Sequence, residues 1–162
     1  MMSKAVMLSI RPKWVEKIAN GEKTIEVRKT RPKLAPPFKA YIYCTMPKYP
    51  HEDFILTDYP KPQFYGGGKV IGEFTCDQFW IGTPHNTNPL FCMAACMDGF
   101  DTEKYAKGKK LYGWHISDLR IYDTPKELSE FTGLRDTKFG AAPYEIKRPP
   151  QSWCYVEAMK DE

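Results

Sequence analysis

The sequence predicts an α+β domain built around a small, strongly bent sheet or barrel of about six strands, with short flanking helices. Short segments rich in β-branched and aromatic residues recur along the chain, mostly at spacings that suit hairpins. Between them lie segments that begin with proline and end with glycine, as short helices do. The composition, 42% hydrophobic and 14% aromatic, is that of a packed globule. At 162 residues, with no long linker, the chain is expected to form a single domain over residues 1–162.

The first part of the chain supplies a strand, a helix and two more strands. Residues 5–10, AVMLSI, form a compact apolar run that is typical of a buried strand. In the following RPKWVEKIANG, Pro12 suits the first helical position and Gly21 the stop. Further strands are expected over residues 24–28 and 39–45.

The second part begins with a long loop over residues 46–68, which contains four prolines and ends in three glycines. In the strand expected over residues 69–80, Gly72 marks a bulge or a close approach of two backbones. The capping box of Thr124 and Glu127 predicts a helix at TPKELSEFTG. The other expected elements are a helix over 88–99 and strands over 109–123 and 152–159.

Charge and cysteine content limit the class of protein. The net charge is +4, but residues 1–50 carry 11 lysines and arginines against three acidic residues. Such a localised basic surface suits a polyanion such as nucleic acid, although a solvated lysine-rich face gives the same count. The five cysteines are scattered in a chain with no export signal, so we expect reduced thiols and a cytoplasmic protein. We expect no membrane association, because no apolar run approaches the roughly 20 residues of a membrane span.

The stretch NGEKTIEVRKT carries the most specific pattern in the chain. Strand residues alternate between two faces, so Ile25 and Val27 point one way, while Glu26 and Arg28 point the other. An exposed ion pair stabilises a protein by at most about 1 kcal/mol, which is too little to explain the arrangement. We therefore expect these two residues and Lys23 to line a ligand cleft, with a surface salt bridge that braces the turn as the alternative.

Gly21, Lys23, Glu26 and Arg28 fit the pattern G-x-K-x-x-E-x-R, and the later strand VIGEF adds Gly72 and Glu73. With these motifs the sequence resembles the ASCH family of the PUA-like superfamily, and its longer members found in phages and prophages. The resemblance implies a PUA-like β-barrel with a cleft beside the motif, and binding of RNA or a nucleotide.

Within that cleft, residue chemistry suggests separate roles. Lys23 and Arg28 suit phosphate, and Glu26 and Glu73 suit a base or a modified group. Tyr65, at the end of the long loop, is the candidate for stacking on a base. We expect no metal and no cofactor, and the sequence identifies no protein partner.

Two alternatives remain open. The chain is similar to a small amidohydrolase branch of the family, in which Lys23 would be the base and Glu73 its partner in cleaving an acylated or modified nucleoside. The threonine of that branch falls on Glu26 here, and Thr24 lies two residues away on the same face. The other alternative is a phage accessory protein that binds a host protein, in which the cleft residues serve only the fold.

Overall fold

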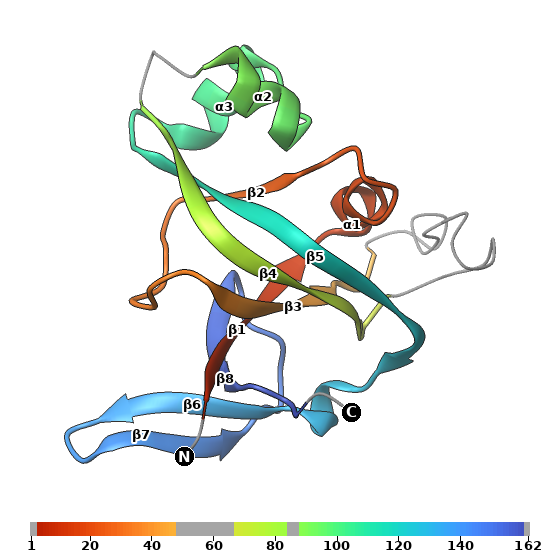
Figure 1. The fold of residues 1–162 in the computed structure, drawn as a ribbon, viewed down its shortest axis with the longest axis vertical. Helices are drawn as coiled ribbons and strands as arrows, with labels where there is room; N and C mark the ends of the chain where they lie inside the picture. Colours follow the sequence, from red (N-terminus) through yellow and green to blue (C-terminus); the bar gives the residue numbers. More distant parts are fainter. Residues whose placement is uncertain (1–2, 48–66, 84–87, 161–162) are drawn as a thin grey trace.

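The computed structural model describes residues 3–47, 67–83 and 88–160, and it confirms the α+β class. Its strands alternate with short helices along the chain (Figure 1). The strands are β1 (Lys4–Ile10), β2 (Ile25–Arg28), β3 (Phe38–Cys44), β4 (Lys69–Gly82), β5 (Leu111–Lys126), β6 (Thr132–Thr137), β7 (Gly140–Glu145) and β8 (Trp153–Glu157). The helices of the described part are α1 (Pro12–Ala19), α2 (Pro89–Ala95) and α3 (Gly99–Ala106), with a 3-10 turn η2 (Leu128–Glu130).

The eight strands form one bent sheet in the order β2-β5-β4-β3-β1-β8-β6-β7. All pairings are antiparallel except that of β1 with β3. The long strands β4 and β5 curve around the molecule and give the sheet a barrel-like shape (Figure 1). The described strands do not close it, because β2 and β7 stand at opposite ends of the order. The expected barrel is therefore an open one.

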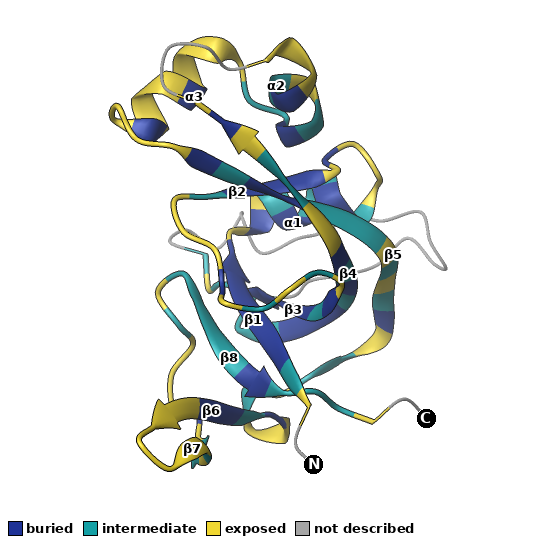
Figure 2. Cartoon of the chain, turned by 60° about the vertical axis from the view of Figure 1, so that its left-hand side comes forward, coloured by how far each residue is buried: buried dark blue, intermediate teal, exposed yellow. Residues whose placement is uncertain are grey.

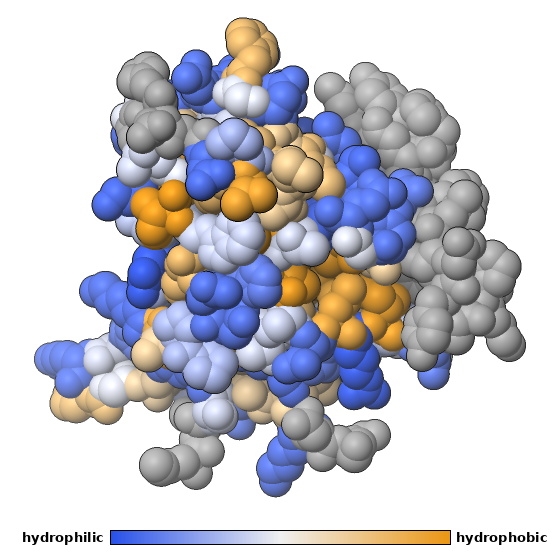
Figure 3. All heavy atoms as spheres, turned by 45° about the horizontal axis from the view of Figure 1, so that its top comes forward, coloured by the Kyte–Doolittle hydropathy of each residue, from blue (hydrophilic) through white to orange (hydrophobic). Residues whose placement is uncertain are grey.

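Apolar side chains fill the interior on both sides of this sheet. The largest cluster lies between β1, β3, β4, β5 and α1, and it includes the fully buried Trp114. A second cluster joins β2 to α2 and α3 through Ile25, Val27 and Phe91. The two helices therefore sit on the apolar face of β2, and the buried colour of β2 and β5 beneath them is visible in Figure 2. The outer surface at this end of the molecule mixes apolar and hydrophilic side chains (Figure 3).

The predicted helix over residues 124–133 is wrong, and the described sheet has eight strands where about six were expected. The strand β5 continues to Lys126, η2 is only three residues long, and β6 follows at once. The capping box belongs to Glu127 and Glu130, whose side chain and backbone groups satisfy each other around η2. Phe131 and Leu134 are buried, and β6 pairs with both β7 and β8. Long-range pairing and burial thus override a local helix signal.

The predicted helix over residues 88–99 is shorter than expected. Asn88 caps α2, since its side chain accepts a hydrogen bond from the Leu90 amide. The helix ends at Ala95, with Cys96 in the left-handed conformation, and Gly99 begins α3 instead of ending α2. The prediction for Gly72 is confirmed: the register shifts there, and a Cβ would lie 2.6 Å from the Arg120 carbonyl oxygen.

Candidate functional site

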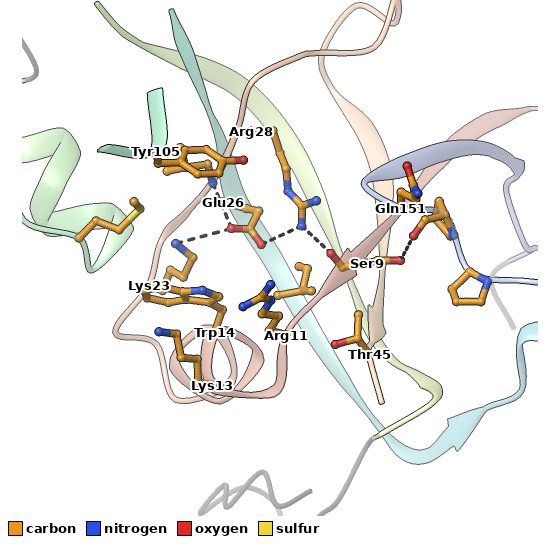
Figure 4. A pocket seen from close by; sticks show the side chains of 15 residues that line it. Ser9, Arg11, Lys13, Trp14, Lys23, Glu26, Arg28, Thr45, Tyr105 and Gln151 are labelled. Carbon is orange, nitrogen blue, oxygen red and sulfur yellow. Dashed lines mark hydrogen bonds and ion pairs between the residues drawn. The ribbon is translucent and has the colours of Figure 1, made fainter. Parts of the chain in front are cut away.

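A pocket in the described part of the chain lies beside β2, where the resemblance placed a cleft (Figure 4). Its volume is about 620 Å3, within the range of small-molecule sites. Residues of β1, α1, β2 and α3 and of the segment before β8 form its wall. The lining consists of Ser9, Ile10, Arg11, Lys13, Trp14, Lys23, Glu26, Val27, Arg28, Thr45, Met97, Tyr105, Pro149, Pro150 and Gln151.

Side chains alternate between the two faces of β2, and two of them point to the pocket. Ile25 and Val27 are buried in the cluster under α2 and α3, so Glu26 and Arg28 face the opposite side. The register pairs Glu26 with Trp114 and Arg28 with Tyr112. The predicted division of faces is thus correct, but both faces are largely covered. The side chains of Glu26 and Arg28 are only 6% and 11% exposed, so their ion pair is not the surface salt bridge that was the alternative to a cleft.

Lys23 is the most deeply buried charged group of the pocket, with 1% of its side chain exposed. Its Nζ donates to the Ala95 carbonyl oxygen at 2.7 Å and lies 3.6 Å from Glu26 Oε1. The ammonium also sits 4.7 Å from the centroid of the Trp14 ring. Burial lowers the pKa of Lys23 below its usual value, and the nearby Glu26 carboxylate partly offsets this effect. Since Ala95 is the last residue of α2, Lys23 also fastens that helix to the site.

Among the described residues that line the pocket, Glu26 is the only acidic one. Its Oε1 accepts from the Val27 amide at 3.1 Å, and its Oε2 accepts from Arg28 Nη2 at 3.3 Å. Together with Lys23, these contacts place one carboxylate between two cations. Such a buried, bonded triad holds its members in fixed positions and leaves a net positive charge in the wall.

Arg28 joins strands that are remote in the sheet order. Its Nη2 donates to the Ser9 carbonyl oxygen at 2.7 Å, and its Nη1 donates to the Ser152 carbonyl and hydroxyl oxygens at 3.1 Å each. The same Ser152 carbonyl accepts from the Ser9 amide at 3.0 Å. Arg28 therefore links the end strand β2 to β1 and to the start of β8, and most of its donors are already used.

The mouth of the pocket carries groups that the sequence did not single out. Arg11 and Lys13, at the start of α1, are exposed. Lys13 Nζ lies 4.5 Å from the centroid of Trp14, so that ring stands between the amines of Lys13 and Lys23 (Figure 4). Tyr105 reaches the pocket from α3. The N-terminal excess of basic residues was the available signal for Arg11 and Lys13, whereas Tyr105 is brought in only by the packing of α3.

The five predicted site residues do not all meet. Lys23, Glu26 and Arg28 come together in one pocket. Glu73 does not line it: its carboxylate pairs with Lys39 at 3.0 Å and accepts from the Tyr122 hydroxyl at 2.8 Å. Tyr65 lies outside the described residues.

Other chemistry within the described residues is limited. No group of three or more His, Cys, Asp and Glu side chains is arranged there to hold a metal ion. The described helices include none of the length and apolar character that a membrane span requires.

The comparisons with known proteins concern the family and the fold. Residues 8–71 match the family model of the ASCH domain. The matched ASCH segment contains Lys23, Glu26 and Arg28 and ends before Glu73. No curated protein matches the chain.

Solved ASCH structures share the fold over almost the whole chain. The ASCH protein from Zymomonas mobilis has a TM-score of 0.63 at 20% identity and covers 94% of this chain and 87% of its own. A serine-to-alanine variant of that protein has a TM-score of 0.65 at 18% identity, with 94% and 88% covered. A tyrosine-to-phenylalanine variant has a TM-score of 0.57 at 19% identity, with 96% and 91% covered. At these identities the likeness shows a common fold.

Proposed function

We propose that this chain binds RNA or a nucleotide in the pocket beside β2. The observation that carries the proposal is the composition of the wall: four basic side chains and one buried carboxylate surround a cavity of about 620 Å3. A pocket with this charge attracts phosphate, and the match to the ASCH domain family over residues 8–71 supports the same ligand class.

The basic residues of the pocket differ in how firmly their side chains are held. Lys23 and Arg28 are held by carbonyl oxygens and by Glu26, so they supply a fixed positive field. The exposed Arg11 and Lys13 are free to move onto a phosphate at the mouth of the pocket.

A base would be recognised by the remaining groups. Tyr105 offers a ring for stacking, which is worth about 1–3 kcal/mol per base. A carboxylate has about four lone-pair sites, so Glu26 retains capacity to accept from a base amine beyond its contacts with the protein.

The test is a tryptophan-fluorescence titration with short single-stranded RNA and with nucleoside monophosphates at two salt concentrations. We compare wild type with Lys13→Ala and, as a control, Lys138→Ala. Both lysines are exposed and lie over an aromatic ring, but Lys138 is on the β6–β7 hairpin at the other end of the molecule. We expect salt-sensitive binding that Lys13→Ala weakens and Lys138→Ala leaves unchanged. The absence of binding by wild type at either salt would refute the proposal.

The amidohydrolase alternative receives less support from the geometry. Neither Glu73 nor Thr24 lines the pocket that contains Lys23, so the expected set of catalytic groups does not assemble around one substrate position.

A further inference from the structure

We infer that the pocket beside β2 holds part of a single-stranded polynucleotide, which continues along the loop after β2, and not an isolated nucleotide. This inference rests on the proposed function and narrows the class of its ligand. It follows from cations that lie beyond the pocket, next to its rim.

The pocket offers a path with two ends. Figure 4 shows Tyr105 on one side of the Glu26–Arg28 pair, and Arg11 and Lys13 on the other. A ligand that fills the space between them reaches exposed cations at the α1 end. At the α3 end it reaches the ring of Tyr105.

The loop after β2 extends this path. Lys29 Nζ lies 4.8 Å from the ring centroid of Tyr105, which joins this lysine to the pocket rim. Two residues later, Arg31 lies 4.4 Å from the ring centroid of Phe79. Both cations are exposed, and neither forms an ion pair with the described residues. Two residues span at most about 7 Å, so these two cation–aromatic pairs lie close together beside the pocket rim.

The loop is held in place as a surface for binding. The Trp153 indole Nε1 donates to Thr30 Oγ1 at 2.9 Å, and the Lys33 amide donates to the Tyr155 hydroxyl at 2.8 Å. These two bonds anchor the loop on either side of Arg31. Its cations are thus presented on an ordered backbone, which lowers the entropy cost of binding.

This arrangement fits a polynucleotide better than a single nucleotide. Proteins that bind single strands combine a basic groove, which follows the backbone, with aromatic rings on which bases stack. Arg11 and Lys13 alone suffice for the phosphate of a mononucleotide. Lys29 and Arg31 contact a ligand only if further phosphates continue past Tyr105.

The experiment compares three proteins: wild type, the double variant Lys29→Ala/Arg31→Ala, and the control double variant Arg135→Ala/Lys138→Ala. The control also removes one exposed lysine and one exposed arginine that lie over aromatic rings, but on the β6–β7 hairpin. The probes are a mixed-sequence single-stranded RNA of roughly eight nucleotides, within the usual site sizes, and the four nucleoside 5′-monophosphates. Thermal unfolding of each variant verifies that its fold is intact.

We expect Lys29→Ala/Arg31→Ala to bind the RNA roughly tenfold more weakly than wild type at low salt. The slope of log affinity against log salt should fall in magnitude by about 1.4, since each phosphate contact on a single strand contributes about 0.7. Monophosphate affinity should not change, and the control should behave as wild type with both probes.

Three results would overturn the inference. In the first, the double variant binds RNA as the control does. In the second, it loses monophosphate affinity to the same extent as RNA affinity, which would place its effect inside the pocket. In the third, wild type binds monophosphates as tightly as RNA, which leaves the proposed function intact. If wild type binds neither probe, the proposed function fails as well.

Discussion

At the scale of single residues, the site depends on one carboxylate between two cations. Sequence reasoning placed Glu26 and Arg28 on one face of a strand and expected them to line a cleft with Lys23, and all three line one pocket. Their burial could not be predicted, because it depends on α2, α3 and the segment before β8. Glu73 was grouped with them through a motif, yet its partners are Lys39 and Tyr122.

Glu26→Gln is expected to lower the free energy of unfolding by about 3 kcal/mol, because it leaves two buried cations without their counter-charge. Urea unfolding measures this change. The matched control is Asp136→Asn, which breaks the Lys4–Asp136 pair at 2.9 Å on the surface and should cost at most about 1 kcal/mol. Equal effects of the two substitutions would mean that the triad contributes no more than a surface ion pair.

Lys23 should also affect the pH dependence of stability. Its pKa is lowered in the folded protein by burial, so between that lowered pKa and the usual value of 10.5 the unfolded chain binds more protons at this residue. The contribution of Lys23 to stability therefore rises with pH through that window. Below that pH window the contribution of Lys23 to stability does not change with pH. It is less favourable there than the contribution of a lysine with the usual pKa.

The measurement is the difference in unfolding free energy between wild type and Lys23→Met from neutral pH to about pH 10.5. The unfolding free energy of wild type should increase relative to that of Lys23→Met as the pH rises. Lys17→Met, which replaces a more exposed lysine that pairs with Glu22, is the control for the loss of one lysine. A flat difference for Lys23→Met would contradict a lowered pKa.

At the scale of elements, the sequence predicted the strands that carry a clear local signal and failed where distant segments decide. Residues 5–10 and 39–45 are strands as predicted, because each is a compact β-rich run. The prediction of a helix over 124–133 was wrong because a capping box and a proline at its start are local signals. They carry no information about the pairing of β6 with distant strands. Gly72 was identified correctly, since a glycine inside a strand usually marks a steric demand.

Gly72→Ala is expected to destabilise the protein by about 2 kcal/mol. The added Cβ would lie 2.6 Å from the Arg120 carbonyl oxygen, and backbone in the middle of a sheet moves only at a cost. Gly99→Ala is the control, because nothing lies within 4 Å of its new Cβ, and it should change stability by less than about 0.5 kcal/mol. Thermal or urea unfolding of both variants measures the two stabilities. Similar values would show that β4 and β5 move apart here at no cost in free energy.

At the scale of the whole molecule, the open sheet brings its end strand β2 close to β1 and the start of β8, and Arg28 bridges them. The resemblance suggested a barrel, but it could not show that a side chain makes this connection. Since Arg28 donates to Ser9 and Ser152, its loss would disturb the fold and the pocket together. For that reason Lys13, and not Arg28, is the residue whose replacement tests binding.

Arg28→Lys keeps the charge beside Glu26 but loses the planar fork that reaches Ser9 and Ser152 at once. We expect a loss of about 2 kcal/mol in unfolding free energy, since charge-assisted hydrogen bonds to buried carbonyl oxygens disappear. Hydrogen exchange provides the local measurement, because the Ser9 amide donates to the same Ser152 carbonyl that Arg28 contacts.

In Arg28→Lys the Ser9 amide should exchange faster relative to amides in the middle of β3 and β4. The control is Arg148→Lys at an exposed position, which should leave both stability and the Ser9 amide unchanged. Arg28→Lys could lower stability while the Ser9 amide exchanges no faster relative to the amides of β3 and β4. That result would mean that the arginine stabilises the fold without joining its strands. Faster exchange confined to Ser9 and its neighbours would instead mean that β1 separates from the segment before β8 beside the pocket, so ligand binding and local stability should rise and fall together.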